Sequence, residues 1–262
     1  MNENNFYEEY GDNGSKQVYS NGISETKVKS NVAFIKVFLW MFAGVFVTFL
    51  TGIGCAELVK YSLATGNSGV FTFFIVLMAI SYIAQFVMCF MIGKSAITDR
   101  KPVAATVEFL IFSVLNGISF SILFAIIDMP LLFQVFGFVC LYFLILAGVS
   151  FLFKSKLEKL GTFALVGLIT LVITSLIGGV VSWFITDHAY YTLSLGISIL
   201  GLVVFTILTI VDVKKIKLTL DQTDNQSGIA IYGAFELYLD FINIFLYVLR
   251  IIIMIAGNSR KD

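Results

Sequence analysis

The sequence has few charged residues, cysteines and histidines, and each shortage narrows the class of protein. Only 13% of its 262 residues are charged, against about 25% in soluble domains, so we expect a membrane protein with several spans and no nucleic-acid partner. Cys55, Cys89 and Cys140 lie in or beside apolar segments, which is typical of buried thiols rather than of a disulfide framework. The single histidine, His188, has no cluster of other metal-ligand residue types around it, so no histidine metal centre and no resident cofactor are expected.

Long apolar runs, in contrast, are abundant. A hydrocarbon core about 30 Å thick needs about 20 apolar residues per helix. Such runs occur at residues 32–53, 70–92, 103–127, 131–153, 160–185, 193–211 and 229–256. Their length and continuity favour helices over barrel strands, which alternate over about ten residues. The only two prolines, Pro102 and Pro130, stand where runs begin and where a helix accepts proline. The sequence therefore predicts an all-α bundle of seven transmembrane helices over residues 31–262.

Residues 1–30 are polar and contain no apolar stretch of the kind found in a signal peptide, so we predict a disordered cytoplasmic tail. The loops after the second, fourth and sixth runs are basic and contain Lys94, Arg100, Lys101, Lys154, Lys156, Lys159, Lys214, Lys215 and Lys217. The positive-inside rule places these loops and the N-terminus in the cytoplasm. The C-terminus is then outside if the last run spans. Arg260 and Lys261 leave open a re-entrant last helix with a cytoplasmic C-terminus.

The last run places polar side chains inside a segment long enough to cross a membrane. Residues three or four apart lie on the same face of a helix. One face of the last run therefore carries Tyr232, Glu236, Asp240, Asn243, Tyr247 and Arg250. An ionisable group at mid-membrane costs roughly 2.5 to 3.5 kcal/mol, so such groups usually face a bundle interior or a water-filled cavity and mark an ion or proton path. An interfacial amphipathic helix is the alternative, but its polar face would be rich in lysine and arginine. We therefore predict a transmembrane helix whose polar face points inward.

Two more acids lie within the spans or at their cytoplasmic edge, Glu108 in the third and Asp212 at the end of the sixth. Burying these two together with Glu236 and Asp240 would oppose insertion by roughly 10 kcal/mol. Protonation, hydrogen bonds to amides such as Asn116, and water in a cavity could offset that cost. Glu108 and Asn116 are two turns apart and give the third helix a polar side.

The geometry of the last two helices decides whether Asp212 and Asp240 can meet. Consecutive helices are expected to be antiparallel neighbours, here joined by a cytoplasmic loop of about seventeen residues. Asp212 lies close to that loop, whereas Asp240 lies about eleven residues, or roughly 16 Å, into the last helix. They can approach only if the last helix starts near Glu236 or if its first turns project into the cytoplasm. Two like charges in a low dielectric cannot both ionise, so a pair that meets would share a proton and respond to pH.

Three segments resemble the Bax inhibitor-1 (transmembrane Bax inhibitor motif) family. Residues 210–217 have the sequence IVDVKKIK, which looks like the family's Tyr-Asp-x-x-x-Ile-Lys segment. Residues 237–245 have the sequence LYLDFINIF, which looks like its specific Leu-Tyr-Leu-Asp-Phe-Ile-Asn-Leu-Phe signature, and residues 115–119, LNGIS, match its glycine motif in the third helix. The resemblance covers the chain after the polar tail.

The resemblance implies a seven-helix bundle that leaks Ca²⁺ through a pH-sensitive pore, with Asp212 and Asp240 as pH sensor and gate and as transient Ca²⁺ ligands. Val211 stands where the family usually has tyrosine, which removes one hydroxyl near the gate. In bacterial relatives an arginine near the cytoplasmic end of the second helix is thought to lock the aspartates, and Lys94 or Arg100 is the candidate here. The lipid bilayer, Ca²⁺ and H⁺ are the expected partners, in a bacterial plasma membrane.

Several other polar residues are candidates for lining or supporting the pore, namely Glu108, Asn116, Glu236, Asn243 and Arg250. Oxygen atoms of carboxylates and amides are the ligands that a hard cation such as Ca²⁺ needs. Selectivity for Ca²⁺ over H⁺ or Na⁺ does not follow from these residue types.

Two other functions compete with the channel. A non-conducting regulator that binds other membrane proteins would use the buried acids only for packing. An intramembrane aspartyl protease also uses one aspartate on each of two successive helices. Such proteases carry Gly-x-Gly-Asp before the second aspartate and a Pro-Ala-Leu loop in the last helix, whereas this chain has Leu237 to Leu239 before Asp240 and no proline after Pro130. We therefore expect a channel and not an enzyme.

Overall fold

Each of the seven apolar runs forms a helix. The computed structural model describes the backbone of residues 3–66, 68–152, 157–181 and 187–258, and side chains within residues 28–66, 68–152, 159–178, 189 and 191–256. In chain order the elements are α1 (Glu3–Thr65), α2 (Ser68–Gly93), the short π-helical segment η1 (Lys94–Thr98), α3 (Pro102–Ile126), α4 (Met129–Ser150), α5 (Leu157–Val181), α6 (Asp187–Gln222) and α7 (Gln226–Asn258). Seven of them contain stretches long and apolar enough to cross a membrane, so the predicted all-α architecture is confirmed.

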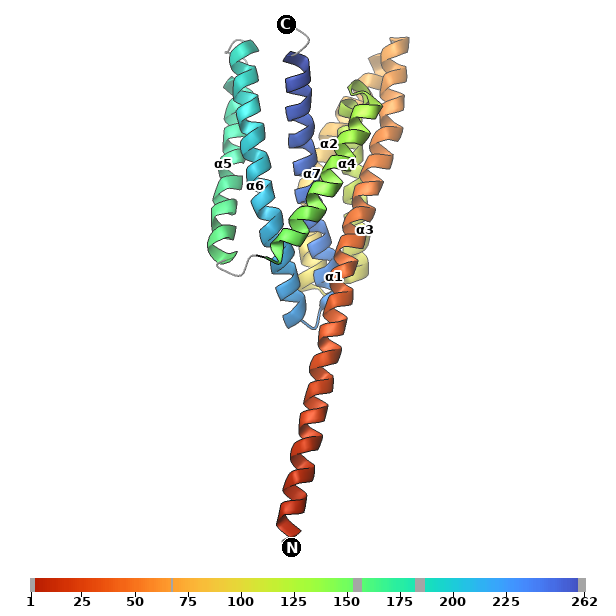
Figure 1. Ribbon diagram of the computed structural model, residues 1–262. Helices are drawn as coiled ribbons and strands as arrows, with labels where there is room; N and C mark the ends of the chain where they lie inside the picture. The colour runs from red at the N-terminus through yellow and green to blue at the C-terminus, as the bar shows by residue number, and fades with distance from the viewer. Residues whose placement is uncertain (1–2, 67, 153–156, 182–186, 259–262) are drawn as a thin grey trace.

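The first helix is longer than the sequence predicted. Helix α1 starts at Glu3, and its first half projects away from the other helices (Figure 1). The prediction of a disordered tail over residues 1–30 therefore differs from the structure, in which residues 3–30 continue the helix. No proline precedes Pro102, so no residue in the tail clashes with helical geometry or removes a backbone donor. Within the described side chains, the part of α1 that is apolar enough to span a membrane lies between Val28 and Thr65.

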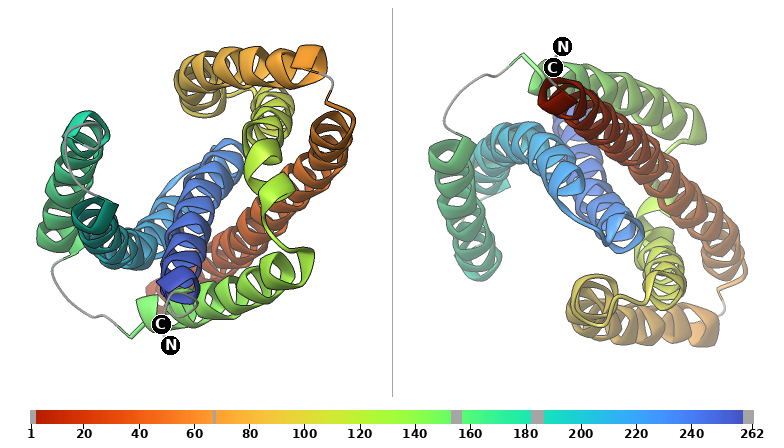
Figure 2. Two further views of the ribbon diagram at one scale, coloured as in Figure 1. Left: turned by 90° about the horizontal axis from the view of Figure 1, so that it is seen from above. Right: turned by 90° about the horizontal axis from the view of Figure 1, so that it is seen from below.

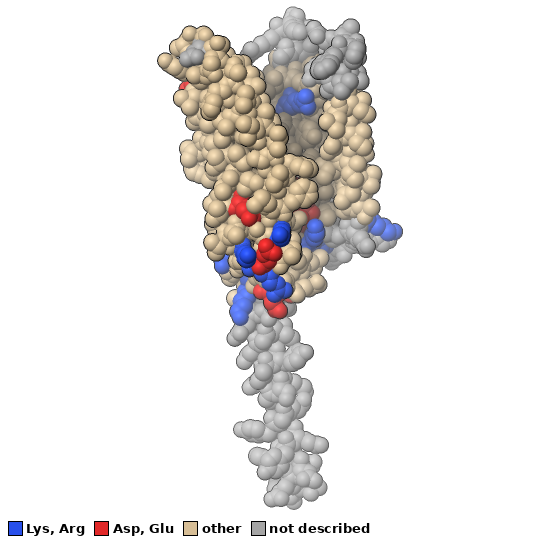
Figure 3. Space-filling view, turned by 180° about the vertical axis from the view of Figure 1, so that it is seen from behind, with Lys and Arg blue, Asp and Glu red and all other residues tan. Residues whose placement is uncertain are grey.

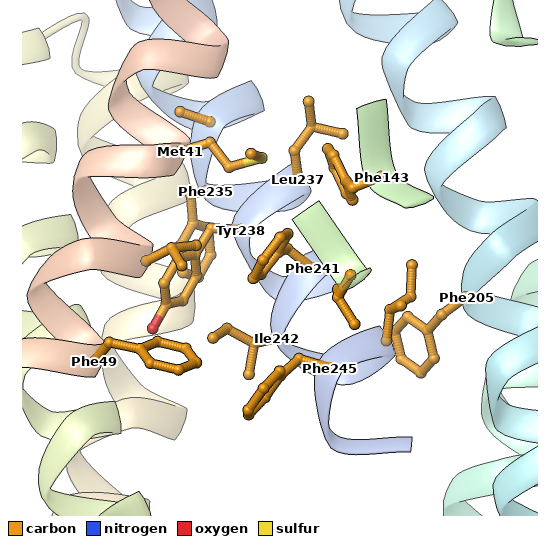
Figure 4. Packing of buried hydrophobic residues seen from close by; sticks show 14 of the residues in the cluster. Met41, Phe49, Phe143, Phe205, Phe235, Leu237, Tyr238, Phe241, Ile242 and Phe245 are labelled. Carbon is orange, nitrogen blue, oxygen red and sulfur yellow. The ribbon is translucent and has the colours of Figure 1, made fainter. Parts of the chain in front are cut away.

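Helix α7 occupies the centre of the bundle, and α1, α3, α4 and α6 pack against it (Figure 2). Its apolar side chains meet aromatic rings from several helices (Figure 4). Phe241 packs against Phe42 of α1 and against Phe143 of α4, and Phe245 packs edge-on against Phe49 of α1. A helix covered on most sides must be apolar on most sides, which explains why only a narrow stripe of α7 is polar.

The last helix runs unbroken from one end of the bundle to the other. The two ends of the chain lie at opposite ends of the molecule (Figure 1), and α7 is continuous from Gln226 to Asn258. No re-entrant turn interrupts it, so the structure favours seven spans over the six-span alternative. Helix α5 packs mainly against α6 and leaves large apolar side chains exposed, as expected for a surface that faces lipid.

Charged side chains gather at the end of the bundle from which α1 projects, while most of the remaining face in view is uncharged (Figure 3). This is the end that the positive-inside rule assigns to the cytoplasm. Within it, Lys217 of α6 donates to the side chains of Ser30 and Asn31 at 2.9 and 2.7 Å and pairs with Asp221 at 3.0 Å. These contacts connect α1 to α6 at this end. The three cysteines are free thiols and are half-buried rather than fully buried.

The connection between α6 and α7 is much shorter than the predicted loop of about seventeen residues. Helix α6 continues to Gln222, and α7 begins at Gln226. The segment after the apolar run contains Lys214, Lys215 and Leu218, which are good helix formers, and no glycine or proline before the turn. Both helices therefore extend past the apolar part. Asn225 precedes the first residue of α7: its side-chain oxygen accepts from the Gly228 amide at 3.2 Å, and its side-chain nitrogen donates to the Ala96 carbonyl of η1 at 2.9 Å.

Candidate functional site: an acidic cluster between α6 and α7

The short connection between α6 and α7 brings three acids to similar positions along the axis of the bundle. Asp212 lies ten residues before the end of α6, and Glu236 lies ten residues after the start of α7. Asp240 follows one turn later, about 6 Å deeper at 1.5 Å per residue. Asp212 and Asp240 can approach because α6 continues to Gln222 before the turn, so that α6 and α7 pack side by side past the acids. We call Asp212, Glu236 and Asp240 the acidic cluster.

Asp240 is the most buried member of the acidic cluster. Its side chain is enclosed, with a residue exposure of 4%, and it lies close enough to Asp212 and Glu236 to interact electrostatically. The hydroxyl of Thr209 is within hydrogen-bonding reach of this carboxyl. Its other carboxyl oxygen, Oδ2, has no hydrogen-bond partner among the described residues. A buried polar atom without a protein partner is uncommon and calls for an explanation, such as a functional role or a bound water or ion.

The Thr209 hydroxyl also constrains the chemistry of Asp240. It donates to the Phe205 carbonyl at 2.8 Å. A hydroxyl has only one hydrogen to donate, so while that bond is made Thr209 can only accept from Asp240. Accepting requires a proton on the Asp240 carboxyl. That the neighbouring carboxyls share a proton stays a prediction.

One lysine faces the acidic cluster. The Lys215 ammonium lies 3.6 Å from Glu236 Oε1, with side-chain exposures of 60% and 19%, and it also interacts with Asp212. Tyr232, one turn before Glu236, hydrogen-bonds to the same carboxyl. A half-exposed ion pair contributes little to stability. Its effect here is electrostatic, because Lys215 neutralises one of three negative charges and leaves the rest to protons or cations.

The two candidates for an arginine-type lock lie elsewhere. Lys94 begins η1 and Arg100 lies in the turn before α3, and both side chains are exposed. Within the part of the chain that the structure describes, neither forms an ion pair with an acid of the cluster. The interpretation of Lys94 or Arg100 as the lock is therefore not supported in this conformation. The lysine that contacts the acidic cluster is Lys215, because the extension of α6 puts it one turn after Asp212.

The remaining predicted residues are not gathered at the acidic cluster. Glu108 of α3 accepts from Ser95 of η1 at 2.9 Å, and its other oxygen has no partner among the described residues. Asn243 donates to the Leu239 carbonyl of its own helix at 2.8 Å. Arg250 is exposed on the outer half of α7. Tyr232, the first residue of the predicted polar face of α7, lies beside Gly93 of α2. The rest of this face lies along α6.

Asn116 belongs to a separate, structural network. Its amide donates to the Tyr238 hydroxyl at 2.7 Å, and that hydroxyl is 2.6 Å from the Thr48 hydroxyl, which donates to the Ser113 carbonyl at 3.0 Å. Tyr238 is fully buried. These bonds join α1, α3 and α7 on the side of α7 that faces away from Asp240, because residues two apart on a helix point in different directions.

Sequence reasoning missed three contacts: Lys215 with the acidic cluster, Tyr232 with Glu236, and Tyr238 with Asn116. Lys215 and Thr209 are each three residues from Asp212, so they share its face if the helix is unbroken. Thr209 already lies within the predicted run, and extending the sixth helix past Val211 on helix propensity would have placed Lys215 on the same face. Nothing in the sequence pairs Tyr238 with Asn116, because the contact depends on how α3 and α7 pack.

The acidic cluster does not form a ready-made metal site. Among the described residues, no group of three or more Asp, Glu, His or Cys side chains is arranged to hold a metal ion. A Ca²⁺ site normally takes six to eight oxygen ligands. Transient binding of Ca²⁺ at Asp212 and Asp240 therefore stays a prediction, and it would need water or carbonyl oxygens in addition.

Comparison with known proteins agrees with the motifs. The chain matches the family model described as "Inhibitor of apoptosis-promoting Bax1" over residues 30–258. It is 35% identical over 162 residues to a protein of Borreliella burgdorferi, covering 60% of this chain and 65% of that one. It is 32% identical over 181 residues to a protein of Deinococcus radiodurans, covering 68% and 73%. It is 31% identical over 160 residues to the "Inner membrane protein YbhL" of Escherichia coli, covering 59% and 64%.

The chain thus spans less than two thirds of the length of the B. burgdorferi and E. coli relatives, and the names of these relatives state no activity. The family match itself covers almost all of the chain that follows the polar tail. The seven apolar helices, the three sequence motifs and the family match all indicate the same family. The chain is an integral membrane protein of the Bax inhibitor-1 family.

Proposed function

We propose that the protein is a pH-sensitive cation leak channel, for Ca²⁺, in which the acidic cluster senses the proton concentration and gates the pore. The observation that carries this proposal is the arrangement of Asp240: a buried carboxyl, next to two others, with one oxygen unpartnered. We place the cluster at the cytoplasmic side of a bacterial plasma membrane, following the basic end of the bundle. The proposal includes no catalytic role.

The charge of the acidic cluster supports gating by protons. Three carboxyls face one lysine, so full ionisation would leave uncompensated negative charge at a buried position. Burying such charge is costly unless protons or cations neutralise it. Loss of the shared proton would therefore push α6 and α7 apart at this level and attract a cation at the same time. Proton release and cation entry are coupled in this proposal, because proton release creates the buried negative charge and cation entry neutralises it.

The aromatic core supports a closed resting state. Next to Asp240 and one turn further along α7, Phe241 and Phe245 are fully buried (Figure 4) and pack against rings of α1, α3 and α4. An apolar filling of this kind excludes hydrated ions. A conducting state must therefore move helices rather than only side chains. The contact between α6 and α7 that contains the acidic cluster is the one that a change of charge would act on directly.

The first test is Ca²⁺ flux into liposomes that contain the purified protein, measured between about pH 6 and pH 8, where a shared proton would titrate. The expected result is a flux above that of protein-free liposomes that changes across this interval. A protein that is folded yet produces no flux at any pH would contradict the channel. It would favour the regulator that binds other membrane proteins, with buried acids used only for packing.

Replacing Lys215 by glutamine is expected to move the pH profile of this flux, because it removes the only positive charge described at the acidic cluster. The same change at Lys94 or Arg100 is expected to leave the profile where it is, since both are exposed and unpaired among the described residues. The three variants change the charge equally, so bulk electrostatics cancel in the comparison. If the pH profile moved only in the Lys94 or Arg100 variant, the residue that locks the aspartates would be Lys94 or Arg100 and not Lys215.

A further inference from the structure

A crevice with basic and apolar walls lies at the cytoplasmic end of the bundle, away from the acidic cluster. It consists of two adjoining cavities of about 200 and 230 Å³, which share Lys36, Ser227 and Ala230. Its walls come from α1, the start of α3 and the first turns of α7. The other lining residues that matter for binding are Lys29, Val32, Trp40, Val103 and Ile231.

The two lysines of the crevice share one side of α1. Lys29 and Lys36 are seven residues apart, which is two helical turns, so they lie on one face. Within the described part of the chain neither lysine has an acidic partner, and no acid lines either cavity. Two cations without an acidic partner among the described residues, beside one crevice, complement an anion.

The apolar walls indicate what kind of anion fits. Trp40 lies one turn beyond Lys36, and Val32 and Val103 are largely exposed beside the crevice. Tryptophan favours the level of the lipid headgroups, and lysine reaches from an apolar stretch to the charged surface. A soluble phosphate would need no apolar wall. A phospholipid presents both a phosphate for the lysines and a chain for the apolar side.

We propose that this crevice binds an anionic phospholipid of the cytoplasmic leaflet, with its phosphate at Lys29 and Lys36 and its acyl chain beside Trp40. Basic pockets between transmembrane helices on the cytoplasmic side recognise anionic headgroups in this way. Occupancy would hold α1, α3 and α7 together at this end. Ile231, in the floor, also packs on Ala96 and Ala105, so the lipid would act on the first turns of the helix that carries Glu236 and Asp240.

Trp40 offers a direct test that needs no ion flux. The chain has two tryptophans, so Trp183→Phe leaves Trp40 as the only one. The protein is placed in phosphatidylcholine nanodiscs that contain, at equal mole fraction, either phosphatidylglycerol or phosphatidylcholine with brominated acyl chains, which quench a neighbouring indole. We expect the brominated phosphatidylglycerol to quench Trp40 more strongly. Each lysine should contribute about a fivefold preference for the anionic lipid.

The controls separate charge at the crevice from charge elsewhere. Lys29→Gln with Lys36→Gln should remove the preference, whereas replacement of both lysines by arginine should keep it. Lys60→Gln is the matched control, because Lys60 is on the same helix but pairs with Glu57 at 2.8 Å near its other end. All variants are first shown to be folded by helicity and by size-exclusion chromatography. Equal quenching by the two lipids, or a preference that survives the double glutamine variant, would overturn the proposal. Loss of the preference on addition of inorganic phosphate would identify a soluble anion instead.

Discussion

Asp240→Asn is expected to remove most of the pH dependence of cation flux. Asparagine has the shape of the protonated acid and can still donate to the Thr209 hydroxyl, so the closed packing should persist. It cannot lose a proton, so this position never acquires charge. A single linked proton can change an equilibrium by up to about tenfold per pH unit. We expect the ratio of the fluxes at about pH 6 and pH 8 to approach one in the variant.

The matched control for Asp240→Asn is Glu57→Gln, which also removes one carboxylate. Glu57 is exposed near the other end of α1 and contacts Lys60, so this variant should keep the pH profile of the unmodified protein. Folding of both variants is checked by thermal unfolding in detergent. An unchanged pH profile in Asp240→Asn would show that Asp240 is not the sensor. Flux that disappears at every pH in a folded variant would instead indicate that the carboxylate is needed to bind the ion.

The sequence predicted the helices and the identity of the acidic residues because both depend on local composition. Twenty apolar residues in a row must form a helix in lipid, since backbone groups have no other partners there. A carboxyl in such a run must face the interior, as Asp240 does at 4% exposure. The family motifs pointed to Asp212 and Asp240 as a pair, and the structure brings these two residues together.

The errors arose where the chain leaves the membrane. Hydropathy ends the sixth run at Val211, but the helix continues to Gln222, because the polar residues that follow still favour helix. The loop was therefore predicted too long and Lys215 was assigned to it. The roles of Asn116 and Arg250 could not be predicted for a different reason. Both depend on which helix lies opposite, and helix packing is set by side chains far apart in the sequence.

Gly117→Ala is expected to destabilise the bundle, and Gly117→Val to prevent its assembly. Gly117 sits where α3 crosses α1, and a Cβ atom there would lie 2.5 Å from the Thr48 carbonyl oxygen and 3.0 Å from the Gly52 nitrogen. Both are backbone atoms, so the helices themselves would have to separate. Small residues allow such close approach between membrane helices. Overpacking costs about 1 to 3 kcal/mol, which should lower the midpoint of thermal unfolding in detergent.

Gly137→Ala is the matched control for Gly117→Ala, because both glycines lie within helices but a Cβ atom at Gly137 would meet nothing within 4 Å. Alanine favours a helix over glycine by about 1 kcal/mol, so the control should be neutral or slightly stabilising. The two variants make the same chemical change and differ only in what the added methyl meets. If both raised the unfolding midpoint equally, the close crossing of α1 and α3 would be wrong. A selective loss at Gly117 would also weaken the Thr48 to Tyr238 bond, since Thr48 is the residue displaced. The glycine of the third-helix motif would then have a packing role, because the close crossing of α1 and α3 positions Thr48 and Asn116 for their bonds to Tyr238 of α7.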